Sequence, residues 1–159
     1  VSGRRRIATG DYFHADVCGA VHRYHARACR TYHMGEPPAE LTAITRILAD
    51  AFDVLVEAAE VGTPFEQVTA RLADYYRDAG VPEGQSFMGG YELGVAFPPD
   101  WVGECCWGSG YDHGDACVEA GLVTNVESVY FLAMVDTVVF EASGPRLLST
   151  VPREILTCG

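Results

Sequence analysis

The hydrophobic period of this chain changes twice, and this change restricts the possible folds more than any other feature. Residues 39–61 place apolar side chains on one helical face, namely Leu41, Ile44, Leu48, Ala51, Leu55 and Ala58, with Phe52 and Ala59 widening it. Residues 63–78 repeat the helical period through Phe65, Val68, Leu72 and Tyr75 or Tyr76. The flanking segments read as strands. The sequence therefore predicts an α+β fold, with two helices packed on one face of an antiparallel sheet.

Local signals predict where the two helices begin and end. Gly62 is expected to end the first helix as its C′ residue, and Gly80 to end the second. Thr63 is expected to cap the second helix, with Pro64 in its first position. Glu66 would then complete a capping box with Thr63.

The segment before the helices predicts two or three antiparallel strands. Side chains in residues 11–34 alternate between two faces, and Gly19 and Ala20 are expected to interrupt the first strand. Gly35 and the pair Pro37–Pro38 would close this region.

The segment after the helices divides into a long loop and a second group of strands. Residues 81–120 are rich in Gly and Pro and are expected to form a functional loop or lid, with a plain surface excursion as the alternative. Residues 122–131 and 134–141 predict paired strands. A turn at Gly144-Pro145 leads to a short strand at 146–149.

Composition excludes several classes of protein. A chain of 159 residues predicts one domain, residues 1–159. The net charge of −11 argues against a nucleic-acid partner, and the eleven basic residues are all arginines, so lysine chemistry is excluded. No apolar run approaches the length of a membrane span. The six cysteines include no CxxC pair, which argues against structural zinc and for reduced thiols in the cytoplasm.

One stretch, Asp16 to Thr31, is denser than any other in groups that move protons or hold anions. Besides Asp16 it contains two histidines, two cysteines and three arginines, namely His22, His25, Cys18, Cys29, Arg23, Arg27 and Arg30. It is therefore the first candidate for a functional site.

Several motifs resemble those of a known family when they are taken in order. They are HRYHARACRTYHMGEPP, a two-helix segment, GGYELGVAFPPDWVGE, GLVTNVES, VDTVVFEASGPRLLS and VPRE. Together they resemble the second half of the pita-bread superfamily, which includes creatinase, methionine aminopeptidase, Xaa-Pro aminopeptidase and dipeptidase. The resemblance covers nearly all of residues 10–156 and is strongest to ectoine-hydrolase-type members. It implies a pita-bread fold truncated on its N-terminal side, without the first helices and strand.

Metal-dependent members of the superfamily bind two divalent ions through two Asp, one His and two Glu. The five matching positions in this chain carry Asp16, Arg27, Tyr91, Glu127 and Val135, the last beside Asp136. Only Asp16 and Glu127 are residue types that bind such ions, and an arginine in place of the third carboxylate would repel them. The resemblance therefore implies no cofactor, although a weakly bound divalent ion is left open.

The pattern also resembles the metal-free members of the superfamily, creatinase and the ectoine-hydrolase-like proteins. This resemblance implies roles for individual residues. Asp16 is the candidate nucleophile or base, and Glu127 the candidate proton carrier. Three residues are candidates for orienting groups or acids, namely His22, His25 and Tyr91, and strand alternation allows at most one of the two histidines in the pocket. The candidates for substrate binding are Arg27, Arg30, Trp101 and Asp136.

Three functions follow from this reading. The first is a metal-independent hydrolase of a C–N bond in a small amide- or amidine-type metabolite. The second is a metal-assisted peptidase or lyase of the same superfamily. The third is a catalytically inactive pita-bread domain that serves as a binding or dimerisation module. The expected partners are a small-molecule substrate and either a second copy of the chain or a missing N-terminal half.

Overall fold

Strands form one sheet in the computed structural model, which describes residues 3–94 and 103–159. In these residues the strands are β1 (Tyr12–Val21), β2 (Tyr24–Met34), β3 (Phe87–Glu92), β4 (Cys106–Gly108), β5 (Val123–Tyr130), β6 (Leu132–Glu141), β7 (Gly144–Leu147) and β8 (Leu156–Cys158). Their order is β1-β2-β6-β5-β3-β4, with β7 beside β6 and β8 beside β2. All pairs are antiparallel except β2–β8, which is parallel.

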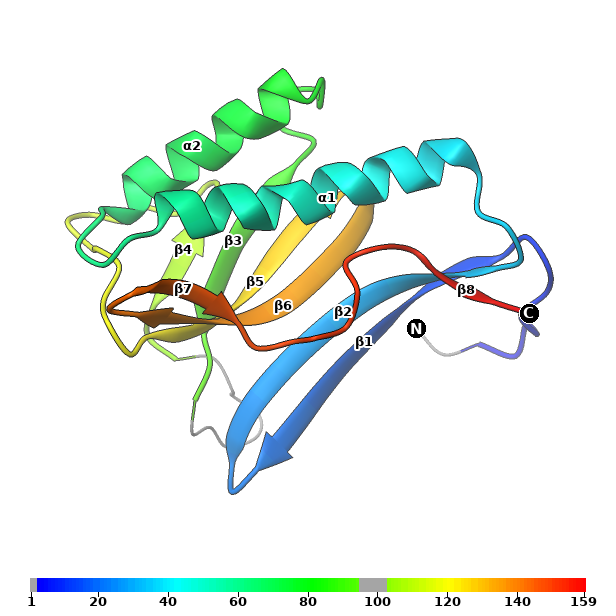
Figure 1. Ribbon diagram of the computed structural model, residues 1–159, viewed down its shortest axis with the longest axis horizontal. Helices are drawn as coiled ribbons and strands as arrows, with labels where there is room; N and C mark the ends of the chain where they lie inside the picture. Colours follow the sequence, from blue (N-terminus) through cyan, green and yellow to red (C-terminus); the bar gives the residue numbers. More distant parts are fainter. Residues whose placement is uncertain (1–2, 95–102) are drawn as a thin grey trace.

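Two helices, α1 (Ala39–Ala58) and α2 (Phe65–Asp78), lie over one face of this curved sheet (Figure 1). Their predicted apolar stripes are buried, since Leu48, Phe52, Leu55 and Phe65 are at most 1% exposed. They pack against sheet residues that include Val126, Met134, Val138 and Phe140. Burial of each large apolar side chain contributes roughly 1.5–3 kcal/mol, so this layer holds the helices on the sheet. The predicted arrangement of two helices on one face is confirmed.

α2 ends at Asp78, just before Gly80, as the sequence predicted. Gly80 has a φ of +81°, a conformation that glycine adopts without strain. Its N–H donates to the Arg77 carbonyl at 3.0 Å, and Val81 N–H donates to the Tyr76 carbonyl at 2.9 Å. These two bonds form a Schellman motif and satisfy carbonyls that the helix leaves open.

The expectations for Gly62 and for the capping box were wrong. α1 ends at Ala58, before Gly62, and the N-cap of α2 is Pro64 with no side-chain cap. Main-chain bonds to residues 116–118 take the place of the box: Gly62 N–H donates to the Val118 carbonyl at 2.8 Å, and Val118 N–H donates to the Thr63 carbonyl at 2.9 Å. The loop between the helices is therefore fixed by a distant segment, which local signals do not report.

The predicted break in the first strand was also wrong. β1 runs through Gly19 and Ala20 to Val21, and the turn falls at His22 and Arg23. Both turn residues have positive φ, +49° and +72°, as in a type I′ hairpin turn whose twist matches that of the strands. The hairpin of β1 and β2 projects beyond the rest of the sheet (Figure 1).

The expected long loop at 81–120 contains two strands, β3 and β4. Its glycines permit close packing of strands: a Cβ on Gly89 would lie 2.3 Å from the Trp107 carbonyl oxygen, and one on Gly90 would lie 1.9 Å from the Asn125 carbonyl oxygen. Trp107 is fully buried and stacks on Phe65 with ring centroids 5.3 Å apart. The predicted strand pair after the loop is confirmed as β5 and β6, and the short strand β7 begins at Gly144.

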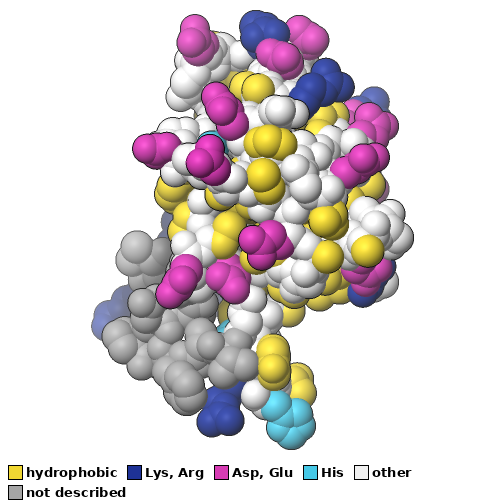
Figure 2. Space-filling model, turned by 90° about the vertical axis from the view of Figure 1, so that its left-hand side faces the viewer, with side chains coloured by type: hydrophobic (Ala, Val, Ile, Leu, Met, Phe, Trp, Pro, Cys, Tyr) yellow, Lys and Arg dark blue, Asp and Glu magenta, His cyan; other side chains and the backbone are white. Residues whose placement is uncertain are grey.

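Among the charged side chains that Figure 2 shows, Asp and Glu predominate over Arg. Asp and Glu side chains are spread over this side of the molecule, in agreement with the net charge of −11. Among the described residues, no helix has both the length and the apolarity needed to cross a membrane. All six cysteines are free thiols.

Candidate active site

A row of side chains crosses the sheet on the face opposite the helices. Asp16 of β1 lies opposite Cys29 of β2, Cys29 lies opposite Val135 of β6, and Val135 lies opposite Glu127 of β5. Directly opposed residues point to the same face of a sheet, so Asp16 and Glu127 share one face. The helices cover the other face, because the hydroxyl of the neighbouring Ser128 donates to a main-chain carbonyl of α1 at 3.0 Å.

A second row runs beside the first and brings in Arg27. The Thr137 hydroxyl accepts the Arg27 N–H at 2.8 Å and donates to the Arg27 carbonyl at 3.0 Å. Thr137 lies opposite Asn125, and Asn125 lies opposite Tyr91 of β3. The sheet thus gathers side chains that are far apart in the sequence.

The Arg27 guanidinium lies at the centre of these rows. Its Nε and Nη2 donate to the two carboxylate oxygens of Asp16 at 2.9 and 2.5 Å. Its Nη1 donates to Glu127 Oε1 at 2.5 Å and to the Tyr91 hydroxyl at 2.6 Å. One cation therefore joins both candidate carboxylates and a tyrosine, with the bidentate geometry that arginine offers to a carboxylate.

The electrostatics of this cluster keep Arg27 charged and Tyr91 neutral. The hydrogen bonds to Asp16 raise the pKa of Arg27 above its ordinary value, and the charge of Glu127 acts in the same direction. Burial raises the pKa of Tyr91, although Arg27 opposes this shift. The Tyr91 hydroxyl accepts a bond from Arg27 and keeps its own proton at neutral pH, so it can donate that proton in a hydrogen bond to a ligand.

Asn125 completes the cluster, and it was not among the residues predicted from the sequence. This residue is fully buried, and its Nδ2 donates to Glu127 Oε1 at 2.9 Å. Its Oδ1 accepts the main-chain N–H of Tyr91 at 3.0 Å. A signal was available, because Asn125 stands two residues before Glu127 in a predicted strand and therefore shares its face.

The described contacts join neither candidate histidine to Arg27, Asp16, Glu127 or Tyr91. His22 lies in the exposed turn at the tip of the hairpin. His25 is part-buried and its Nδ1 lies 3.2 Å from the Gly94 carbonyl oxygen, a main-chain contact. The placement of His22 follows from the length of β1, which puts the turn three residues later than expected. His25 stands two residues before Arg27 in β2 and shares its face of the sheet.

Two candidates for substrate binding, Arg30 and Asp136, form a buried ion pair away from Arg27. Arg30 Nη2 donates to both Asp136 carboxylate oxygens at 2.8 and 2.9 Å, and the two side chains are 3% and 1% exposed. The remaining Arg30 donors bind main-chain carbonyls, including that of Pro152 at 2.8 Å. The pair ties β2 and β6 to the C-terminal segment. Trp101 lies outside the described residues.

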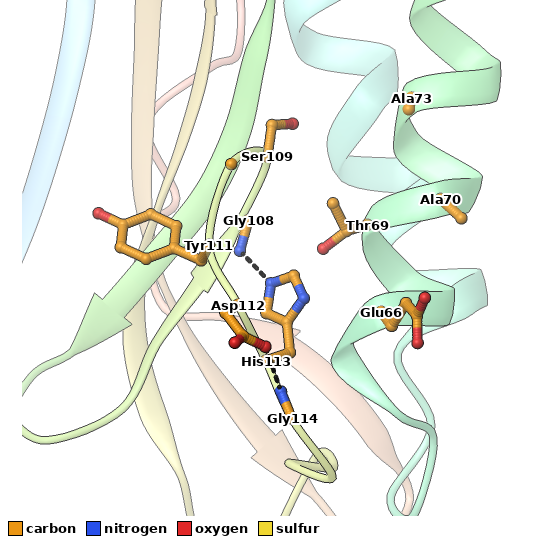
Figure 3. Close-up of a pocket in the computed structure, with 11 residues that line it drawn as sticks. Glu66, Thr69, Ala70, Ala73, Gly108, Ser109, Tyr111, Asp112, His113 and Gly114 are labelled. Carbon is orange, nitrogen blue, oxygen red and sulfur yellow. Dashed lines mark hydrogen bonds between the residues drawn. The ribbon is translucent and has the colours of Figure 1, made fainter.

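A cavity of about 500 Å³ lies between α2 and residues 108–114 (Figure 3). His113 Nε2 accepts the Gly108 N–H there at 3.0 Å, while Glu66 and Thr69 line the helix side. Tyr111 points away from the cavity in this view. The lining of this cavity shares no residue with the cluster around Arg27.

Comparison with protein families gives a match to the model of metallopeptidase family M24 over residues 1–145. Among curated proteins, the ectoine hydrolase of Halomonas elongata is 29% identical over 96 residues. That alignment covers 60% of this chain and 23% of the relative. This chain therefore matches about a quarter of the relative's length.

Solved structures share the fold. The X-Pro aminopeptidase of Thermotoga maritima superposes with a TM-score of 0.80 at 21% identity, over 96% of this chain and 42% of that protein. The dipeptidase of Pyrococcus horikoshii superposes with a TM-score of 0.81 at 24% identity, over 98% of this chain and 44% of that protein. The predicted pita-bread fold, covering only part of such a protein, is confirmed.

A metallopeptidase family implies catalytic metal ions, and the residues of this cluster do not fit them. Asp16 and Glu127 are the two carboxylates at the site, and both already bind the Arg27 guanidinium. A divalent cation at this site would have to displace the Arg27 guanidinium or lie next to its positive charge, which would repel it. Within residues 3–94 and 103–159, no group of three or more His, Cys, Asp or Glu side chains is arranged to hold a metal ion.

Proposed function

This chain belongs to metallopeptidase family M24, and we propose that it is a metal-independent hydrolase of a C–N bond in a small amide- or amidine-type metabolite. The observation that carries the proposal is the Arg27 guanidinium, which binds both carboxylates where the family would place metal. The similarity to an ectoine hydrolase supports a small substrate.

In the proposed reaction Glu127 moves the proton. Both described hydrogen bonds to Glu127 end on Oε1, so Oε2 is the oxygen that can take a proton from a water molecule. The water oxygen bonds to the substrate carbon, and the electron pair of the C=O or C=N bond moves to its heteroatom. The electron pair on the heteroatom then returns to re-form the double bond as the C–N bond breaks, and Glu127 gives the proton to the leaving nitrogen. Water is consumed and Glu127 is regenerated.

Tyr91 and Arg27 support this step in different ways. Tyr91 keeps its hydroxyl proton because burial raises its pKa, so it can donate to the heteroatom that gains negative charge. Arg27 holds Glu127 and Tyr91 in place and stabilises the charge of the cluster. Asp16, with both oxygens bound by Arg27, is assigned here to holding Arg27 and not to nucleophilic attack.

The test is hydrolysis of a panel of small amides, linear and cyclic amidines and Xaa-Pro dipeptides, in EDTA and in added Mn²⁺, Co²⁺ or Zn²⁺. We expect turnover that is unchanged by EDTA or metal. Glu127→Gln should lower kcat by at least about 100-fold, as loss of a general base does. Glu141→Gln is the matched control, because it makes the same change in an exposed pair with Arg146. Two tightly bound divalent ions per chain, or activity that requires added metal, would overturn the proposal and favour the metal-assisted peptidase or lyase.

The second candidate is a binding module without catalysis, and the closed ion-pair cluster favours it. Arg27 pairs with both Asp16 and Glu127 without any ligand, as it would in a structural network. This candidate predicts that no compound in the panel is turned over. It also predicts that Asp16→Ala and Glu127→Gln leave binding of every ligand unchanged.

We further propose that a second body of protein covers this face of the sheet, either a second copy of the chain or a further N-terminal segment. The Asp16 and Glu127 side chains are 42% and 27% exposed, which leaves both carboxylates more open to bulk water than in a closed active site. Light scattering coupled to size-exclusion chromatography gives the number of copies in solution. A monomer that is fully active in the 159-residue form would contradict the proposal.

A further inference from the structure

We infer that Asn125 is the positioning residue of this site and that it reserves Oε2 of Glu127 for proton transfer. The inference rests on the proposed function and adds to it the residue that orients the general base. Asn125 is fully buried directly beside Glu127, and both ends of its amide are engaged.

The orientation of the amide follows from its partners. The main-chain N–H of Tyr91 can only donate, so the Asn125 atom that it meets at 3.0 Å must be the oxygen. The other end of the amide is then the NH₂ group, and it faces Glu127 at 2.9 Å. A flipped amide would set two donors against each other at one end and two acceptors at the other.

This orientation decides which oxygen of Glu127 is reactive. Oε1 accepts two N–H donors, one from Asn125 and one from Arg27. Both lone pairs of Oε1 point at N–H donors, so neither is left to bind a proton. A proton on Glu127 must therefore be bound to Oε2. Asn125 and Arg27 together therefore fix both the rotamer of the carboxylate and the oxygen that does chemistry.

Asn125 also couples the base to the proposed oxyanion donor. Arg27 Nη1 binds the Tyr91 hydroxyl and Glu127, while Asn125 binds Glu127 and the Tyr91 main chain. These four hydrogen bonds close a ring across β2, β5 and β3. A shift of Tyr91 is therefore transmitted to Glu127 through the buried Asn125 amide. Loss of that amide would leave the Tyr91 main-chain N–H without its hydrogen-bond partner and remove one of the two donors to Glu127 Oε1.

The first experiment needs no catalytic activity. Asn125 is the single asparagine of the 159-residue chain, and Gln67 and Gln85 are its two glutamines, so the side-chain amides give three resolvable pairs of NMR signals. We expect the Asn125 NH₂ protons to exchange with solvent at least tenfold more slowly than those of exposed Gln67 and Gln85. We also expect Glu127→Gln to shift them. The inference would be overturned if the Asn125 NH₂ protons exchanged as fast as those of the two glutamines. It would also be overturned if their chemical shifts were the same in Glu127→Gln as in the wild type.

The second experiment uses Asn125→Asp, which keeps the acceptor for Tyr91 N–H and replaces the donor to Glu127 by a like charge. We expect kcat to fall at least 100-fold with KM within threefold, and the acid limb of the rate–pH profile to move at least one pH unit upward. Gln67→Glu is the matched control, since it makes the same amide-to-carboxylate change on the exposed side of α2. An unchanged profile and kcat in Asn125→Asp would overturn the inference.

The two experiments separate failure of this inference from failure of the proposed function. If the wild-type chain hydrolyses nothing, the proposed function fails, and the NMR exchange rates alone decide whether Asn125 orients Glu127. If Asn125→Asp does not fold, Asn125→Ala replaces it. That variant removes the same donor without adding charge, and we expect at least a tenfold loss of kcat with an unchanged KM. A loss smaller than threefold would contradict the role.

Discussion

Arg27 Nη1 lies 2.5 Å from Glu127 Oε1, and this bond links residues that are 100 positions apart in the sequence. The same guanidinium binds both oxygens of Asp16. The position between the two carboxylates is therefore filled by a side chain that stays protonated at any physiological pH. This arrangement gives the site its own fixed cation, and its removal has a measurable consequence.

Arg27→Asp should turn the cluster into a divalent-cation site. The change removes the positive charge and adds a third carboxylate beside Asp16 and Glu127, which is a set of oxygen donors suited to hard cations. Isothermal titration with Mn²⁺ should give affinity at least tenfold tighter than in the wild type. Saturation at 100 times Kd should stabilise the variant by about 2.7 kcal/mol. Arg27→Met is the control, because it removes the charge without adding a ligand; equal Mn²⁺ affinity in Arg27→Asp and the wild type would contradict this account.

Gly90→Ala should disrupt the approach of β3 to β5, and with it the position of Tyr91. A Cβ at Gly90 would lie 1.9 Å from the Asn125 carbonyl oxygen, which is main chain and cannot move aside. We expect a loss of at least about 3 kcal/mol in the free energy of unfolding, measured in urea, since the strands must separate. Gly19→Ala is the matched control: it also lies in a strand, but no atom is within 4 Å of its Cβ position. That variant should change stability by less than about 0.5 kcal/mol.

The sequence predicted those parts of the fold that depend on local periodicity. The apolar stripes of α1 and α2 and the strand pair β5–β6 follow from spacing within each segment, so they could be found without tertiary information. The end of α1 could not, because Gly62 is held by the distant residue Val118. β3 was missed because its glycines resemble loop signals, whereas Gly89 and Gly90 are there to let strands pack closely.

The candidate site divides in the same way. Asp16, Glu127 and Tyr91 were chosen by resemblance at family ligand positions, and the structure brings all three to Arg27. Their roles in catalysis remain predictions. Asn125 was missed because an uncharged amide gives no electrostatic signal in a sequence. His22 was chosen for its chemistry, but its position depends on where the hairpin turns, and that was misplaced by three residues.

Alkaline pH should destabilise the chain through Cys29. Burial raises the pKa of this thiol to about 11, above its ordinary value of 9.0. Because the folded state holds the proton more tightly, the stability is fully present below pH 9 and is lost as the pH rises through 11. A thiol pKa that is one pH unit higher in the folded state contributes about 1.4 kcal/mol to the free energy of unfolding. The stability lost in this pH window is therefore up to roughly 2–3 kcal/mol. Urea unfolding between pH 8 and 11.5 measures it. Cys29→Ala should flatten the profile, whereas Cys18→Ala, at an exposed thiol, should not; equal slopes in the two variants would refute the assignment.

Arg30→Ala should cost far more stability than Arg153→Ala, although both remove an arginine from an ion pair. Arg30 and Asp136 are 3% and 1% exposed, so loss of the guanidinium leaves a buried carboxylate without its partner, at a cost of about 3–5 kcal/mol. Arg153 and Asp53 are 30% and 65% exposed, and such pairs contribute less than about 1 kcal/mol. Arg30→Met combined with Asp136→Leu should recover much of the loss, because no buried charge remains. The comparison is made by urea unfolding of the four proteins at pH 7. A loss below 1 kcal/mol in Arg30→Ala, or a double variant less stable than Arg30→Ala, would show that this pair does not tie the strands as its geometry indicates.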